Sequence, residues 1–126
     1  MSYLKIENME IAFNTLKGKF VAVRDINLEI EKGQIVSIIG HSGCGKSTIM
    51  NAIAGMTFPS SGKVTLHGRE VKGPGPDRGI VFQNYSLLPW LSVYQNIYQA
   101  VDAALKNLPK SEKRETVEKY LHMVNL

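Results

Sequence analysis

The sequence predicts an α/β protein, on three observations in chain order. Alternating polar and apolar residues dominate the first 30 residues, which is typical of strands with one exposed face. The short, mostly β-branched run Ile35–Ile39 then precedes a glycine-rich loop and a helix-forming stretch, and such a run is typical of a strand buried on both faces. The last third of the chain changes to helix formers with apolar residues three and four positions apart.

Two strands and a tight connection account for the opening segment. Tyr3–Ile11 alternates loosely and predicts a first strand, and Phe20–Val23 with Ile26–Ile30 predicts a second. The intervening Asn14–Lys19 contains Gly18 and two lysines, which is typical of a hairpin-like connection. We therefore expect an antiparallel pair at the N-terminus.

The middle of the chain predicts a helix and three strands. Lys46–Ala54 has helical composition, and the turn Pro59–Gly62 precedes a short strand at Lys63–His67. A rigid Pro-Gly turn at Gly73–Asp77 leads into Gly79–Phe82, a second apolar strand. We expect both apolar strands, Ile35–Ile39 and this one, to lie in a parallel sheet covered by helices.

Two helices are predicted at the C-terminal end. Val93–Leu105 contains good helix formers, with apolar residues at positions 93, 97, 100, 101 and 104. Ser111 is expected to cap a last helix. The apolar residues of that helix fall at i, i+3, i+4 and i+7: Val117, Tyr120, Leu121 and Val124.

Composition restricts the class of protein. The 126 residues allow one domain, and 44% hydrophobic with 21% charged residues is an ordinary globular balance. No apolar run approaches the roughly 18 residues of a membrane-spanning helix. The single cysteine, Cys44, excludes an internal disulfide framework and a multi-cysteine zinc site. The net charge of +4 favours anionic partners, although interleaved acids make a solvated mixed-charge surface the simpler interpretation. We expect a cytoplasmic protein.

One segment carries recognisable chemistry. Gly40–Ser47 (hereafter the P-loop) matches G-x-x-x-x-G-K-[ST] at every fixed position, between a predicted strand and a predicted helix. Glycines let backbone N–H groups approach phosphate oxygens, and a helix N-terminus adds positive potential. Lys46 is expected to contact the β- and γ-phosphates, and the Ser47 hydroxyl to ligate Mg²⁺. The expected phosphate-contacting set is Gly40, His41, Ser42, Gly43, Cys44, Gly45, Lys46, Ser47 and Thr48.

Within that set, three positions have more specific expectations. Thr48 is placed toward the α-phosphate. His41 and Cys44 occupy variable positions of the motif, so we expect His41 to contribute its backbone and the small Cys44 side chain to fit beneath the loop. The motif predicts nucleotide binding but leaves the nucleoside and the reaction open.

The order and spacing of several segments resemble the ATP-binding subunit of ABC transporters. The resemblance covers nearly the whole chain and implies an ABC-type P-loop ATPase core with antiparallel N-terminal strands. It implies one partial, truncated domain over 1–126, with a nucleotide-binding core at about 1–88 and the start of a helical subdomain at about 89–126. It is carried by Asp25–Gly33, Gly40–Thr48, Ala54-Gly55, Ser60–Gly62, Val81–Asn84 and Leu87–Val93.

Three stretches look more specifically like the nitrate-import branch of the nitrate, sulfonate and taurine group. They are Gly40–Gly43, Gly73–Arg78 and Asn84–Val93. The resemblance implies ATP and Mg²⁺ as cofactors and hydrolysis that drives import of nitrate or nitrite. Bicarbonate, sulfonate and taurine remain alternatives, because the ATPase subunit does not itself hold the solute.

The resemblance also implies roles for residues outside the P-loop. Gln83 would join Lys46 as a catalytic residue, its amide reaching Mg²⁺ and the attacking water while its loop faces the membrane subunit. Phe13 would stack on adenine, with Phe20 as the alternative because Asn14–Lys19 blurs the alignment. The apolar stretch Tyr85–Leu91 would dock a helix of a membrane partner or pack in the core.

The implied partners are a transmembrane permease subunit and a second ATP-binding subunit, in a homo- or heterodimer, and no nucleic acid. The implied location is the cytoplasmic face of the cell membrane. The family's Leu-Ser-Gly-Gly-Gln signature, its Asp-Glu strand end and its switch histidine do not occur in the 126 residues, and His67 and His122 stand in other contexts.

We therefore expect this chain alone to bind nucleotide weakly, if at all, to turn it over negligibly and to self-associate. Two other classes stay open at this point. One is a small P-loop kinase, and the other is a non-catalytic module that binds a permease or a partner ATPase.

Overall fold

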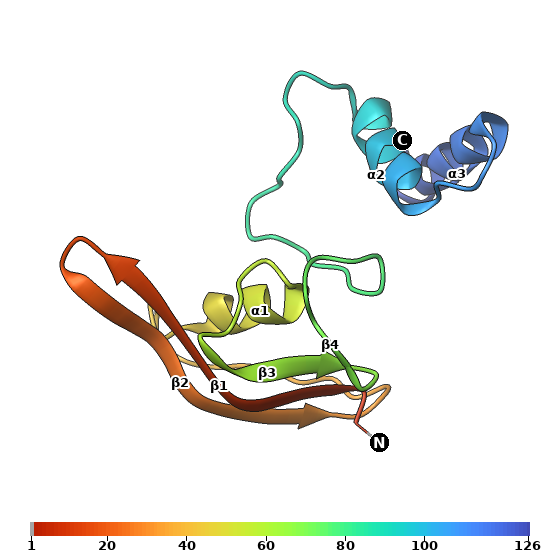
Figure 1. Cartoon of the computed structure of the whole chain (residues 1–126). Coiled ribbons are helices and arrows are strands. Elements are labelled where there is room, and N and C mark those ends of the chain that lie inside the picture. The colour runs from red at the N-terminus through yellow and green to blue at the C-terminus, as the bar shows by residue number, and fades with distance from the viewer. Residues whose placement is uncertain (1) are drawn as a thin grey trace. The chain divides into compact units, whose positions relative to one another are not determined.

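The structure, a computed structural model, describes residues 2–126 as two compact units that meet in sequence between Ile80 and Val81. The first unit contains all the strands and one helix, and the second contains two helices (Figure 1). In chain order the elements are β1 (Leu4–Thr15), β2 (Gly18–Ile30), α1 (Lys46–Ala54), β3 (Ser61–Leu66), β4 (Arg69–Glu70), α2 (Val93–Ala104) and α3 (Lys110–Met123).

The first unit is a four-stranded sheet in the order β2-β1-β3-β4, with every neighbouring pair antiparallel. The N-terminal hairpin is confirmed, with Leu16 and Lys17 as its two-residue loop between Thr15 and Gly18. The second predicted strand forms as one continuous element. The two-residue strand β4 was not predicted, because two residues are too few to show an alternating pattern.

The core of the first unit lies between α1 and one face of the sheet. A one-residue irregularity at Asn8, whose φ is +47°, changes the phase of β1 so that Met9 faces the core after Leu4 and Ile6. The displaced Asn8 N–H is satisfied by the side-chain oxygen of Asn27 at 2.9 Å. The buried cluster consists of Leu4, Ile6, Met9, Ile11, Val23, Ala52, Val64, Leu66 and Val71.

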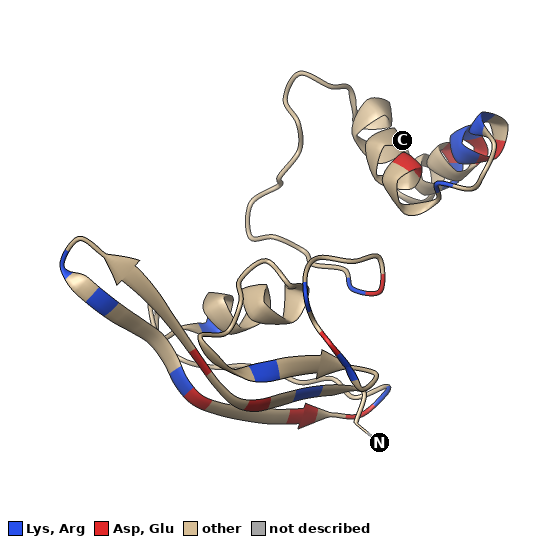
Figure 2. Ribbon diagram, viewed as in Figure 1, with Lys and Arg blue, Asp and Glu red and all other residues tan. Residues whose placement is uncertain are grey.

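Basic and acidic residues are spread along the strands of the sheet (Figure 2), and ion pairs join several of them on the face opposite the core. Glu7 accepts from Lys5 at 3.0 Å and lies 3.3 Å from Lys63, and Glu10 joins Arg24 at 3.2 Å. The hydrogen bond from Lys5, followed by that from Lys63, lowers the pKa of Glu7. The hydrogen bond from Arg24 lowers the pKa of Glu10.

Acid is expected to destabilise this sheet through those two carboxylates. Their folded-state pKa values lie below the ordinary 4.5, so the unfolded chain takes up protons first as the pH falls. The stability that they contribute is complete above 4.5 and is lost as the pH falls through the lowered values. The urea midpoint of Glu7→Gln/Glu10→Gln should therefore depend less on pH than the wild-type midpoint. The effect should be small because the ion pairs are exposed. A urea midpoint that depends on pH as strongly in the double variant as in the wild type would contradict the prediction.

Two predicted strands do not form. Ile35–Ile39 and Gly79–Phe82 have no ladder partner among the described residues, and no parallel pairing occurs there. Ile35 and Ile39 are 96% and 93% exposed, and Val81 is exposed as well. Apolar composition indicates that a segment is suited to a buried strand, but the strand exists only when another chain segment supplies the hydrogen bonds.

The second unit pairs α2 with α3. The predicted α2 is confirmed within one residue. Ser92, which was not predicted as a cap, begins it in a capping box with Gln95. The prediction that Ser111 caps α3 is wrong. The helix begins at Lys110 after Pro109, whose carbonyl accepts from Lys113 N at 3.1 Å.

The two helices meet through Val101, Val117 and an ion pair between Lys113 and Asp102 at 2.8 Å. Only part of the apolar face predicted for α3 is buried. Val117 is fully buried, whereas Tyr120 and Val124 are exposed. A single neighbouring helix covers only a narrow stripe of α3, which explains the difference.

Candidate nucleotide-binding site

The P-loop enters α1 through two glycines in the left-handed region, Gly43 at φ +78° and Gly45 at φ +101°. Gly45 is the N-cap and offers no side-chain acceptor, and the first turn of α1 contains no acidic residue. The first helical hydrogen bond runs from Ile49 N to Gly45 O at 3.1 Å, so the N–H groups of residues 46–48 precede the ladder. These N–H groups and the helix dipole together suit an anion.

Gly45 also fixes where this helix end lies. A Cβ at Gly45 would stand 2.5 Å from Val23 Cγ1 and 3.1 Å from the Ala22 carbonyl oxygen. The absence of a side chain therefore lets the start of α1 rest directly against β2. The N–H groups that face a phosphate are held to the sheet by this contact.

Lys46 places its charge inside the loop. Its Nζ donates to the carbonyl of Gly40 at 2.5 Å and to that of His41 at 2.6 Å, and it lies 3.3 Å from Cys44 Sγ. The loop carbonyls hold the ammonium close to the N-terminus of α1. A compact cation there, beside unpaired N–H groups, can neutralise a polyphosphate chain.

The remaining motif residues are Cys44 and His41 in the loop and Ser47 and Thr48 at the start of α1. The Cys44 thiol points inward, because a Cβ at Gly40 would be 2.6 Å from its Sγ, although the residue as a whole is exposed. The His41 ring lies back on its own loop, with Nδ1 2.9 Å from the carbonyl of Ser42. Ser47 is exposed and Thr48 is half-buried at the start of α1.

The Ser47 hydroxyl fits a magnesium site only when a bound phosphate ligand supplies further oxygen atoms to the ion. Among residues 2–126 no group of three or more His, Cys, Asp or Glu side chains is arranged to hold a metal ion. Mg²⁺ in nucleotide sites takes few protein ligands and completes its shell with phosphate oxygens and water. One hydroxyl next to an anion-binding loop fits that pattern.

The remaining candidate residues are Gln83, in the second unit, and Phe13 and Phe20, in the first unit. Gln83 is exposed and belongs to the second unit, in the segment 81–92 before α2, whereas the P-loop lies in the first unit. Phe13 and Phe20, treated as alternatives from the sequence, are directly opposite one another across β1 and β2. They are 42% and 58% exposed.

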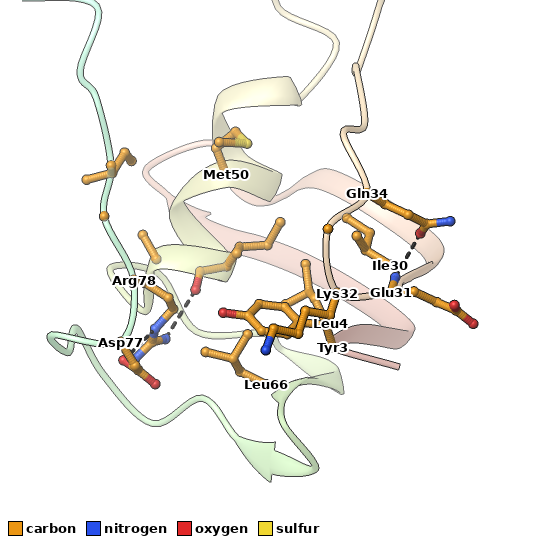
Figure 3. Close-up of a pocket in the computed structure, with 15 residues that line it drawn as sticks. Tyr3, Leu4, Ile30, Glu31, Lys32, Gln34, Met50, Leu66, Asp77 and Arg78 are labelled. Atoms are coloured by element: carbon orange, nitrogen blue, oxygen red, sulfur yellow. Dashed lines mark hydrogen bonds and ion pairs between the residues drawn. The ribbon is translucent and has the colours of Figure 1, made fainter. Parts of the chain in front are cut away.

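A cavity of about 460 Å³ lies elsewhere in the first unit (Figure 3). The C-terminal half of α1, the ends of β1 and β2 and residues 77–80 line it, with no residue of the P-loop. Its walls are mainly apolar, and its one arginine, Arg78, donates to the Ile53 carbonyl at 3.2 Å and to Asp77. The cavity is therefore continuous with the core and separate from the anion site.

Comparison with known proteins decides the family. Residues 23–126 match the protein family described as ABC transporter. The chain belongs to this family. Among curated ABC proteins, it is 50% identical over 125 residues to the bicarbonate transport ATP-binding protein CmpC of Synechocystis. It is 47% identical over 124 residues to the nitrate import ATP-binding protein NrtD of Synechococcus elongatus.

These alignments cover 98% of this chain in both cases, but 19% of CmpC and 45% of NrtD, so the chain spans less than half the length of either relative. A solved structure, described as the dimeric post-hydrolysis state of the ATP-binding cassette MJ0796 bound to ADP and Pi, superposes with a TM-score of 0.82. It is 27% identical and covers 98% of this chain and 57% of that one. The ABC-type α/β fold class is confirmed. No helix among residues 2–126 is long and apolar enough to cross a bilayer.

Proposed function

We propose that the P-loop of this chain binds MgATP, and that the whole protein hydrolyses ATP to drive import of a small anion, nitrate or nitrite. The observation that carries the proposal is the position of Lys46, whose Nζ lies 2.5 Å from the Gly40 carbonyl beside the open N-terminus of α1. The family match and the likeness to a cassette described with ADP and Pi support it.

Each residue of the loop has a separate task in this proposal. Backbone N–H groups around Gly43 and Gly45 hold phosphate oxygens, and Lys46 neutralises the β- and γ-phosphates. Ser47 supplies one ligand to Mg²⁺, and Thr48 lies toward the α-phosphate. Magnesium, when bound, supplies charge neutralisation on the phosphates. Phe13 stacks on the base.

Hydrolysis needs groups beyond this loop, and the sequence of 126 residues contains no Asp-Glu pair. We propose that the isolated chain turns MgATP over negligibly, while residues about 1–88 act as the nucleotide-binding core and about 89–126 begin the helical subdomain. Phosphate release by the purified chain tests this, and turnover at an ordinary enzymatic rate of about 1 per second or more would contradict it.

The proposed partners are a membrane permease subunit and a second ATP-binding subunit, at the cytoplasmic face of the membrane. In the second unit, Tyr85, Leu87 and Trp90 are exposed in the segment before α2. An apolar, aromatic stretch of this kind suits a docking contact with a helix of the permease. The relative described as a dimer supports the second subunit.

Sequence identity does not choose the solute, because the nitrate and bicarbonate relatives are 47% and 50% identical to this chain. We propose nitrate or nitrite on the segments that resemble the nitrate branch. The experiment is uptake by vesicles that contain the complete gene product with its permease and energised by MgATP. Nitrate should be imported and should stimulate phosphate release, whereas stimulation by bicarbonate alone would move the assignment to bicarbonate.

Replacing Gln83 with alanine in the complete gene product should separate binding from hydrolysis. A side-chain amide that orients water and Mg²⁺ acts on the chemical step, so phosphate release should fall on the order of 100-fold. MgATP affinity should stay within about threefold, since the phosphate cradle is intact. The neighbouring Asn84→Ala is the matched control. Unaltered hydrolysis in Gln83→Ala would remove this residue from the mechanism.

A further inference from the structure

We propose that Arg78 is a positioning residue for ATP hydrolysis. Its guanidinium fixes the start of the segment that leads to Gln83 against the C-terminal end of α1, the helix whose other end carries the P-loop. The inference rests on the proposed roles of the P-loop and of Gln83 and deepens them. It assigns control of the chemical step to a residue that contacts neither phosphate nor metal.

Arg78 joins two parts of the chain that are 25 residues apart in sequence (Figure 3). Its Nη1 donates to the carbonyl of Ile53 at 3.2 Å, and its Nη2 donates to that of Gly73 at 2.8 Å. Its Nε donates to Asp77 Oδ1 at 3.2 Å. The side chain is only 14% exposed, so water competes little for these bonds. A planar guanidinium can serve three acceptors in fixed directions, which the ammonium of a lysine cannot do.

The Ile53 carbonyl is one that α1 itself leaves without a partner. The last four carbonyls of a helix have no N–H group within the helix to pair with. In α1, Asn51 and Ala52 accept from backbone N–H groups of the turn that follows, whereas Ile53 accepts from Arg78. The guanidinium also lies at the negative end of the helix dipole, where a cation is favoured. Arg78 therefore completes the C-terminal cap of α1.

Two glycines let the Gly-Pro turn before Arg78 lie directly on this helix end. A Cβ at Gly55, the C-cap of α1 at φ +80°, would collide with the carbonyl group of Gly73. A Cβ at Gly75 would stand 2.7 Å from Asp77 Oδ1 and 3.1 Å from Arg78 Nη2. The lack of side chains at both positions leaves room for the close approach and for the ion pair. The turn and the helix end are therefore packed as one piece.

The position of Arg78 limits where Gln83 can reach. Gln83 follows Arg78 by five residues, which span at most about 18 Å when fully extended. The nine residues of α1 that separate its C-terminal cap from the P-loop measure about 14 Å. To act at phosphates held by the P-loop, the segment from Arg78 to Gln83 must use most of its length. A shift of its starting point therefore shifts the amide of Gln83.

Lysine at position 78 separates this positioning role from a purely structural one. An ammonium keeps the charge at the end of α1 and can donate to Ile53 or to Gly73, so most of the stability should remain. It cannot hold both carbonyls and Asp77 in the geometry of the guanidinium. Arg78→Lys should therefore loosen the start of the segment without unfolding the first unit.

Phosphate release and MgATP calorimetry on the complete gene product test the inference. Arg78→Lys should lower the maximal rate of phosphate release about 10-fold or more, because small misplacements of a reacting group are costly. Its MgATP affinity should stay within about threefold of wild type, and its urea midpoint should be close to wild type. Arg69→Lys, the same substitution at an exposed position on β4, is the matched control and should change none of the three.

A double variant tests whether Arg78 acts through Gln83. In a Gln83→Ala background, Arg78→Lys should change phosphate release less than about twofold, since the amide that it positions is already gone. Asp77→Asn keeps the guanidinium but weakens one of its three bonds, so it should give a smaller loss of rate, about two- to fivefold, again with unchanged affinity. If Arg78→Lys does not fold cooperatively, this split between rate and affinity in Asp77→Asn decides the inference.

Three results would overturn the inference while leaving the proposed function intact. They are a wild-type rate in Arg78→Lys, a loss of MgATP affinity as large as the loss of rate, and a loss of rate that is undiminished in the Gln83→Ala background. Unaltered hydrolysis in Gln83→Ala alone would instead remove the proposed role of Gln83, and the inference with it. A wild-type protein that binds no MgATP would refute the proposed function itself.

Discussion

Lys46→Ala is expected to remove at least about 99% of the affinity for MgATP, a loss of about 100-fold or more. The ammonium is the one side-chain cation that the loop carbonyls of Gly40 and His41 hold at the N-terminus of α1, within the described residues. Truncating one partner of a hydrogen-bonded charge pair costs about 2–5 kcal/mol, and about 2.8 kcal/mol of that range is already a 100-fold loss. Calorimetric titration of the complete gene product measures it.

Two further variants make the Lys46 result specific. Lys32→Ala removes the same charge from an exposed turn of the first unit and should leave affinity within about twofold. Lys46→Arg keeps the charge but replaces a compact ammonium with a planar guanidinium, so its affinity for MgATP should lie between those of Lys46→Ala and the wild type. Affinity within threefold of wild type in Lys46→Ala would show that the P-loop does not hold the phosphates.

Gly45→Ala is expected to destabilise the first unit by about 2–5 kcal/mol and to abolish nucleotide binding. A non-glycine residue at φ +101° costs about 1–2 kcal/mol, and the new Cβ would collide with Val23 Cγ1 and the Ala22 carbonyl, at about 1–3 kcal/mol more. The helix N-terminus would have to leave β2. Urea unfolding followed by far-ultraviolet circular dichroism measures the loss.

Gly43 provides the matched control for this prediction. It also lies in the left-handed region, at φ +78°, but a Cβ there would have nothing within 4 Å. Gly43→Ala should therefore cost only the conformational part, about 1–2 kcal/mol. Gly79→Ala, with neither feature, should be close to neutral. Equal losses for Gly45→Ala and Gly43→Ala would mean that the contact with β2 does not fix the helix.

Local signals were enough to predict the elements that position the site. The helix Lys46–Ala54 was predicted with its observed bounds, because a glycine lies at each end and helix formers fill the interior. The hairpin was predicted because Gly18 and the alternation around it are features of the adjacent sequence. The P-loop was identified by a motif whose glycines, at +78° and +101°, have the left-handed conformations that its chemistry requires.

Features that depend on distant partners were not predictable in the same way. Ile35–Ile39 is apolar enough for a buried strand, yet strand formation needs hydrogen bonds that its own sequence does not supply. The pairing of Phe13 with Phe20 depends on the exact register of the hairpin, which the sequence left as a choice.

The most direct measurement of the central claim is a calorimetric titration of the folded complete gene product with MgATP, alongside Lys46→Ala. We expect one saturable site per P-loop in the wild type and no measurable binding in the variant. A cooperatively folded wild-type protein that gives no binding heat and no protection from thermal unfolding by MgATP would contradict it.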